Sequence, residues 1–388
     1  MRSSTIPGRN TPNSSCAPPN NFSMKAFFLR HKKLHIWLLL DLAALALFYL
    51  VRGQTAWMNA VARHVTAPLR RGIASITYLT DVSMMEVLCI LLVIAAPAYI
   101  LWSIIAVKRR KGGRLHRAYS AVLGAVCTGL GVWAAFCLLW GINCWTDSFQ
   151  TRSGIHAQPV SKEDLTAVTA YFAKKLTDCA HDVPRDDSGA FAVPYEDILT
   201  AAPHAYDAVE QEFPFLSYDD PGVKAVHFSR VMSGLDFTGI FCPFTAESNV
   251  NVDCPASRLG ATVAHELAHQ RGIFSEQECN FLGILASTTC GDAAYEYAGW
   301  SSAFVYAGNA LYSVDPETYW AIRAALPREV ERDFAVSTAY WDQFADKAPQ
   351  KVSNTIYDGV LKAWGEELGI RSYGTVVDLL VTYYKDFL

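Results

Sequence analysis

Charged residues are scarce in this chain, and acidic ones are almost missing from its first part. Only 18% of the 388 residues are charged and 51% are apolar, which excludes a disordered or fibrous protein and is unusual for a soluble one. Residues 1–142 contain 16 Lys and Arg but only three acidic residues, whereas residues 143–388 contain 17 basic and 34 acidic residues. This split predicts two compartments or phases, and it argues against a nucleic-acid partner for the acidic part.

Three long apolar runs account for the apolar excess. They cover residues 34–51, 87–107 and 118–142, and each is long enough to cross about 30 Å of hydrocarbon as a helix. Asp41 in the first run costs about 2.5–3.5 kcal/mol on insertion, which the leucines of that run offset, and we interpret it as a polar group facing the neighbouring helices. A cleaved signal peptide is the alternative for this run, but the run begins late and is long. The sequence therefore predicts an integral membrane protein with three spans.

The basic flanks of these runs predict an orientation. Residues 1–33 are expected to form a basic cytoplasmic N-terminus, disordered over the Pro-, Ser- and Asn-rich residues 1–23. The loop 108–117 contains six basic and no acidic residues, so the positive-inside rule also places it in the cytoplasm. Residues 143–388 are then extracytoplasmic. Residues 52–86 have two open interpretations, an interfacial helix on the outer face or an amphipathic connector.

Cysteines are present in the acidic part, but none of them forms a C-x-x-C pattern, so a thiolate zinc site is not expected. An even number of cysteines in an exported domain permits three disulfides. Buried free thiols that act as small apolar side chains are the alternative, and the sequence does not choose a pairing. These residues are Cys144, Cys179, Cys242, Cys254, Cys279 and Cys290.

The acidic part has a mainly helical pattern with one small patch of strands. Apolar residues recur at helical spacing after Ser161 and again from Pro255 to the end of the chain. Residues 223–252 instead form short runs broken by Gly, Pro and Asp, which is typical of strands and hairpins. We therefore expect a mainly α (α+β) domain over residues 143–388.

The chemistry is concentrated in the segment His265-Glu266-Leu267-Ala268-His269. Two histidines four residues apart lie on one face of a helix, close enough to bind one tetrahedral Zn²⁺, with Glu266 adjacent to the metal. The alternative is a pair of surface histidines on an amphipathic helix. Chance would produce such a pattern in about one chain in a hundred of this length, so we expect a zinc site.

A third ligand is expected from the residues that follow. Gly272 fits the left-handed residue that ends the first helix, and Ser275 fits the N-cap of the next one. Ser275 and Glu278 match a capping box, which gives Glu278 a structural role and leaves Glu276 as the favoured metal ligand, with Glu278 as the alternate. Asn280 lies one turn beyond Glu276, where its amide can orient a liganding histidine.

These motifs resemble two known groups of proteins. HELAHQRG followed by SEQECNFLG resembles the gluzincin-type zinc metallopeptidases, in which the HExxH histidines and a downstream Glu bind zinc. More narrowly, the chain resembles the bacterial membrane proteins grouped as domain of unknown function 3810, which have three N-terminal spans, a segment like GIFCPFTAESNVNV and a C-terminal stretch like VSNTIYDGVLKAWGEELGIRSYGTVVDLLVTYY. The resemblance covers about residues 25–388 and implies a zincin-like domain anchored in a bacterial plasma membrane. Cys279 stands where that family more often has Ala.

The implied reaction is peptide-bond hydrolysis, with zinc activating a water molecule and Glu266 acting as general base. Residues 239–252 are the candidate edge strand that would hold an extended peptide or protein substrate, and a structural hairpin is the alternative. The hydroxyl of one tyrosine would stabilise the oxyanion, although each candidate also fits the core or the rim. The candidates are Tyr295, Tyr297, Tyr306 and Tyr357.

Two other functions are compatible with parts of this pattern. A catalytically silent zinc-binding membrane sensor or scaffold would keep the metal for folding alone. An intramembrane protease would need its HExxH motif inside a long apolar span, and here Arg258, Gln270 and Arg271 flank the motif. A membrane-anchored zinc metallopeptidase is therefore the favoured hypothesis. The sequence does not indicate the substrate or the oligomeric state.

Overall fold

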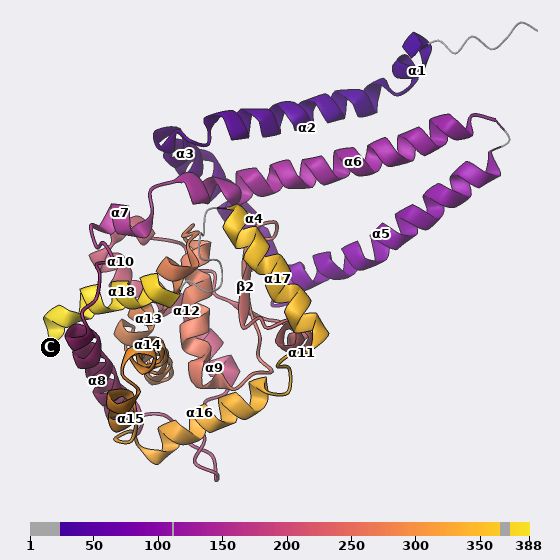
Figure 1. The fold of residues 1–388 in the computed structure, drawn as a ribbon. Coiled ribbons are helices and arrows are strands. Elements are labelled where there is room, and N and C mark those ends of the chain that lie inside the picture. The colour runs from indigo at the N-terminus through magenta and orange to yellow at the C-terminus, as the bar shows by residue number, and fades with distance from the viewer. Residues whose placement is uncertain (1–23, 111, 365–372) are drawn as a thin grey trace, which may run out of the picture.

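The computed structural model describes residues 24–110, 112–364 and 373–388. The segment expected to be disordered, residues 1–23, lies outside this range. The fold is mainly helical with one small sheet, as predicted. Figure 1 shows three long helices that project from a larger, mostly helical part of the molecule.

The three projecting helices are α2 (Lys32–Val51), α5 (Met84–Arg109) and α6 (Arg114–Leu139), and a short helix, α1 (Met24–Arg30), precedes them. All three are long and apolar enough to cross a membrane. None of the residues in the apolar window of α5 is buried within the protein. Apolar side chains in such numbers need a non-aqueous surrounding, so the prediction of a membrane protein is supported.

The third of these helices begins and ends earlier in the chain than the predicted run, 118–142. The apolar run continues to residue 142, but α6 ends at Leu139 and a 3₁₀ turn, Gly141–Trp145, follows. Trp140 leaves the helical region with φ −137° and ψ −54°. The indole of Trp364 packs directly on Gly141, where a Cβ would lie 2.5 Å from the ring. A distant aromatic residue therefore packs on the turn that follows the helix.

Residues 52–86 connect the first two spans and pack on the larger part of the molecule. They form α3 (Thr55–Val61), one π-helical turn (Ala62–Thr66) and α4 (Ala67–Thr77). The Tyr78 hydroxyl donates to the carbonyl of Gly222 at 3.0 Å, and the Thr77 hydroxyl donates to that of Thr245 at 3.0 Å. The structure therefore favours the interpretation of this segment as a connector.

The larger part is built around three consecutive helices, α12 (Leu259–Gln270), α13 (Glu276–Thr289) and α14 (Ala293–Val314). Their fully buried apolar side chains form one core with α8 (Lys162–Cys179) and α18 (Tyr373–Tyr384). The remaining helices lie around this core. They are α7 (Phe149–Ser153), α9 (Tyr195–Ala201), α10 (Asp207–Glu212), α11 (Ser229–Gly234), α15 (Pro316–Arg323), α16 (Arg328–Trp341) and α17 (Ala348–Ala363).

The predicted strand patch is a three-stranded sheet with the order β1-β3-β2. Strand β1 (Lys224–Ala225) is parallel to β3 (Glu247–Val250), and β2 (Gly239–Cys242) is antiparallel to it. Residues 239–252 therefore contain an edge strand, β2, and a central strand, β3. The segment is a hairpin with β2 at the edge of the sheet, and the binding of a substrate to that edge stays a prediction.

Strand β3 also holds the first turn of α5. Ser83 is the N-cap of α5, and its hydroxyl donates to Oδ1 of Asn249 at 2.6 Å. The buried Glu247 carboxylate accepts the N–H groups of Met84 (3.2 Å) and Met85 (2.9 Å) and is paired with Lys224. A carboxylate at a helix N-terminus satisfies free N–H groups and the helix dipole. We call Ser83, Lys224, Glu247 and Asn249 the α5 clamp, because they fix a membrane-spanning helix to the sheet.

Candidate metal centre

The two motif histidines lie one turn apart on α12, as predicted. The centroids of the His265 and His269 rings are 4.8 Å apart. Helix α12 ends in a left-handed residue, Gly272, with φ +90°. The N–H of Ile273 bonds to the carbonyl of Ala268, and the N–H of Gly272 bonds to that of His269, which is a Schellman ending. The turn is short and brings the start of α13 back over the histidines.

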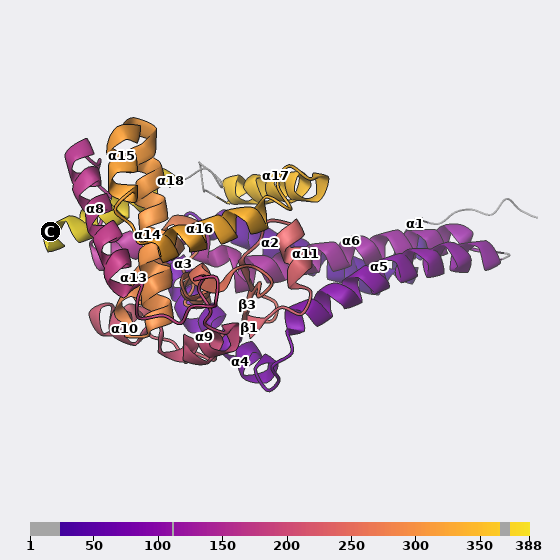
Figure 2. The ribbon, with the colours of Figure 1, turned by 90° about the horizontal axis from the view of Figure 1, so that it is seen from below.

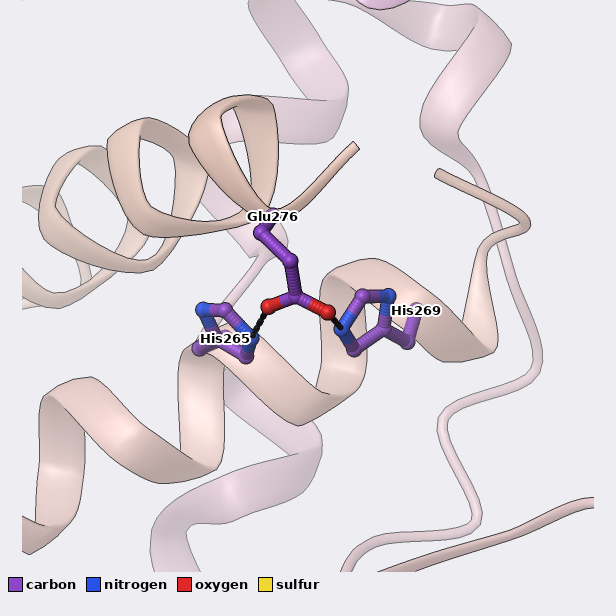
Figure 3. A group of neighbouring side chains, drawn as sticks. All are labelled: His265, His269 and Glu276. Carbon is purple, nitrogen blue, oxygen red and sulfur yellow. Dashed lines mark ion pairs between the residues drawn. The ribbon is translucent and has the colours of Figure 1, made fainter. Parts of the chain in front are cut away.

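Glu276, the first residue of α13, points its carboxylate at both histidines (Figure 3). Its Oε2 is 3.2 Å from Nε2 of His265, and its Oε1 is 3.5 Å from Nε2 of His269. One ligand atom from each of the three residues lies within 4.8 Å of the others, so the group is able to hold a metal ion. Burial alone would raise the pKa of Glu276, but the two imidazoles hold that pKa well below its ordinary value. An ionised carboxylate thus faces two imidazoles.

The second ring nitrogen of His269 is held by the backbone. Its Nδ1 donates to the carbonyl of Ile273 at 2.9 Å and lies 3.3 Å from the Cys279 sulfur. Such a bond fixes the tautomer and leaves Nε2 free for a metal. We predicted that Asn280 orients a histidine; at His269 the Ile273 carbonyl has this role, while Asn280 lines the cavity beside His265. Sequence reasoning missed Ile273 because a backbone carbonyl carries no residue signature.

Glu278, the alternate ligand, points away from the histidines. Its carboxylate accepts the N–H of Phe149 at 2.9 Å and that of Gln150 at 3.0 Å, in the first turn of α7. Ser275 is the N-cap of α13 but makes no side-chain cap bond, so the predicted capping box is wrong. Glu278 has a structural role, as we predicted, but its hydrogen-bond partners are 128 and 129 residues away in the chain and not in its own helix.

Glu266, the predicted general base, is buried between α12 and strand β2. Burial raises the pKa of this carboxyl to about 7, although the two histidines lower it. Its Oε2 has no hydrogen-bond partner among the described residues. A Cβ at Gly239 would collide with the carboxyl group, at 2.8 Å from Cδ. The Ser248 hydroxyl donates to the backbone carbonyl of Glu266 at 2.9 Å, so both strands of the hairpin position this residue.

The four predicted tyrosines divide into two groups. Tyr295 and Tyr297 are buried in the core, where their hydroxyls donate to the carbonyl of Ile198 and to Asp333. Tyr306 and Tyr357 line the cavity at the histidines. The Tyr357 hydroxyl, from α17, donates to Oε1 of Glu276 at 2.7 Å, and burial beside this carboxylate raises the pKa of Tyr357.

A cavity of about 710 Å³ contains the metal group and Glu266. The edge strand β2 forms one wall of it, and α17 contributes Asn354, Tyr357 and Val360. Phe136 and Trp140, at the end of the membrane-spanning helix α6, also line it. The cavity therefore has a polar centre at the metal group, and its lining extends as a groove to the end of α6.

The six cysteines of the acidic part are all free thiols. The three disulfides that their number permits are not formed, and the alternative of free thiols holds. Cys279 is fully buried against His269, so its proximity to the metal group explains why only a small side chain fits there.

Comparison with known proteins gives one match. No curated protein and no solved structure matches the chain. A family model described as protein of unknown function (DUF3810) matches residues 62–381. This range includes the α5 clamp, the edge strand and the complete metal group, and it agrees with the resemblance noted in the sequence. The chain therefore belongs to the DUF3810 family of proteins of unknown function.

Proposed function

We propose that this protein is a membrane-anchored zinc metallopeptidase that hydrolyses peptide bonds of an extracytoplasmic protein or peptide. The observation that carries the proposal is the placement of a buried, unpaired carboxylate, Glu266, in the same cavity as a His265–His269–Glu276 group that is able to hold a metal ion. A purely structural metal site has no need of a second acid beside it that is not a ligand.

The donor set fits zinc. Two imidazole nitrogens and one carboxylate oxygen are the protein ligands of a typical catalytic zinc site, which keeps one position open. When bound, zinc supplies the Lewis acidity that polarises a scissile carbonyl and lowers the pKa of a water molecule. Asn280, which lines the cavity beside His265, remains our candidate for supporting that ligand.

The protein's own groups would perform the remaining steps. Glu266 is placed to accept a proton from the attacking water at Oε2 and to deliver it to the leaving amine. Strand β2 offers a free edge to which an extended substrate can pair as an added strand. Of the two tyrosines in the cavity, we favour Tyr357 as the donor to the developing oxyanion, because its hydroxyl already lies 2.7 Å from Glu276.

The membrane arrangement follows from the positive-inside rule. The basic loop between α5 and α6 would lie in the cytoplasm, and an odd number of crossings would place the metal centre outside. For a bacterial cell this means anchoring in the plasma membrane with the cavity on the outer side.

The substitution Glu266→Gln in the full-length protein tests the proposal. It should leave stoichiometric zinc in place but lower peptide cleavage by about 10²- to 10⁴-fold, because the proton acceptor is lost and the ligands remain. Zinc content is measured by elemental mass spectrometry, and cleavage is measured on a proteome-derived peptide library. Glu317→Gln, at an exposed position on α15, is the matched control.

Equal cleavage by wild type and Glu266→Gln would contradict the proposal. Zinc binding by the wild type without cleavage of any library peptide would favour the silent sensor or scaffold instead.

A further inference from the structure

Helix α17 exposes a stripe of apolar side chains that reaches the cavity of the metal group at Val360. Val352, Ile356 and Val360 are 59%, 62% and 45% exposed, and residues four apart share one helix face. The opposite face is bound to the site, through the bond from Tyr357 to Glu276 and a bond from Asn354 to Asp236 at 3.0 Å. Hydrogen bonds on one face of α17 therefore hold the helix to the site, and exposed apolar side chains lie on another face.

The end of α17 lies beside the membrane-spanning helices. Trp364, directly after α17, has its ring centroid 6.2 Å from that of Phe48 on α2 and 5.6 Å from that of Trp133 on α6. Trp133 precedes the end of α6 by six residues, which is about 9 Å along a helix. The Nε1–H of Trp133 donates to the Tyr49 hydroxyl at 3.2 Å, and such Trp and Tyr pairs are typical of the membrane–water interface.

Figures 1 and 2 both show α17 at the level where the long helices join the larger part, with α11 close to its other end. Phe228, before α11, and Val231 within it are 52% and 59% exposed. Exposed apolar residues are therefore present on both elements. We define the interfacial stripe as Val352, Ile356 and Val360 of α17.

The lining of the cavity reaches this stripe. Val360 belongs both to the stripe and to the cavity lining, and Ile240, an exposed residue of the edge strand, lines the cavity too. Phe136 and Trp140 extend the lining to the end of α6. A chain that emerges from the bilayer beside α6 would meet an aromatic wall first and the metal group next.

We propose that the interfacial stripe rests in the headgroup region of the bilayer, and that the groove takes an extended segment of a polypeptide anchored in that same bilayer. The bilayer is the occupant that fits, because Trp364, directly after α17, packs on α2 and α6, which are long and apolar enough to cross a membrane. A helix with one apolar face lies in the interface plane. The assignment of the substrate rests on the proposed peptidase function, whereas the lipid contact does not.

The lipid contact is tested by photocrosslinking. The full chain carries p-benzoylphenylalanine at Ile356 and is reconstituted in phosphatidylethanolamine–phosphatidylglycerol vesicles, with the same group at Trp320 of α15 as the control, because Trp320 is 54% exposed and outside the stripe. Lipid adducts, detected by mass spectrometry, should be about tenfold more abundant at 356. Equal adducts at both positions, or a crosslinked dimer in place of lipid at 356, would overturn the contact.

The substrate assignment is tested with one peptide library in two forms, free and carrying a palmitoyl chain, added at equal total concentration to the same vesicles. The anchored form should be cleaved at least about tenfold faster, because confinement to the surface raises its effective concentration at the groove. Equal or faster cleavage of the free form would refute a membrane-anchored substrate. If neither form is cleaved, the proposed function fails together with the substrate, while the adducts at 356 still decide the lipid contact.

Discussion

At the scale of single residues, two glutamates of the same helix turn have separate tasks. Glu276 faces two imidazoles at 3.2 and 3.5 Å, whereas Glu278 accepts two backbone N–H groups of α7. The side chains diverge because successive positions on a helix differ by about 100°. Removal of Glu276 and removal of Glu278 are therefore expected to change different properties of the protein.

Glu276→Ala should lower zinc affinity by more than about 100-fold, because the loss of a ligand costs more than the loss of a group that merely supports one. Glu278→Ala should retain stoichiometric zinc and destabilise the fold by about 2–3 kcal/mol, because two buried N–H groups lose a charged acceptor. Zinc titration with a chromophoric chelator and thermal unfolding in detergent distinguish the two. Retained zinc affinity in Glu276→Ala would remove Glu276 from the ligand set.

Gly239 is a residue at which only hydrogen leaves room for the Glu266 carboxyl group. A Cβ there would lie 2.7 Å from Cγ of Glu266. Gly239→Ala should therefore displace the carboxyl and reduce cleavage at least about tenfold, while zinc stays bound. Gly234→Ala is the control, because a Cβ at that position would meet no atom within 4 Å. Unchanged cleavage by Gly239→Ala would show that the position of the carboxyl is not critical.

At the scale of elements, the α5 clamp joins a spanning helix to the sheet by a buried ion pair. The side chains of Lys224 and Glu247 are 4% and 0% exposed. The Lys224 ammonium also donates to the carbonyls of Thr77 and Val82 at 2.7 and 2.9 Å. Breaking a buried pair leaves an uncompensated charge, which costs far more than breaking an exposed pair.

Lys224→Met should lower the free energy of unfolding by about 3–5 kcal/mol. Lys174→Met is the matched control, because Lys174 pairs with Asp178 on the exposed surface of α8, and it should leave the unfolding temperature unchanged. Both are measured by thermal unfolding of the full chain in detergent. Similar unfolding temperatures for the two variants would mean that the clamp does not stabilise the fold.

The features that could be predicted from the sequence are those that depend on residues close together in the chain. The three spans follow from hydropathy, and the turn at Gly272 follows from helix-ending rules. The choice of Glu276 over Glu278 rests on a capping box that does not form, but Glu276 does lie beside the histidines. The errors have distant causes. Trp364 packs on Gly141, just beyond the end of α6, and the Glu278 carboxylate accepts the N–H groups of Phe149 and Gln150 instead of forming a capping box with Ser275. No local pattern encodes such contacts.

At the scale of the whole molecule, the charge asymmetry predicts opposite sides of the membrane for the basic loop and the metal centre. Gly112→Cys and Asp187→Cys, each compared with the parent chain, should show this in intact cells. A membrane-impermeant maleimide should label residue 187 and leave residue 112 unlabelled until the cells are lysed. The reverse labelling pattern would invert the topology.

The α5 clamp also has a consequence for the order in which the protein is made. Glu247 is synthesised 163 residues after Met84, whose N–H group it accepts. Until then the first amides of an already inserted helix have no carboxylate partner, and the later chain must dock onto them as it emerges. The α5 N-terminus would thus act as a docking site during biogenesis, and residues 143–388 produced alone would leave the buried Glu247 carboxylate without the N–H groups of Met84 and Met85.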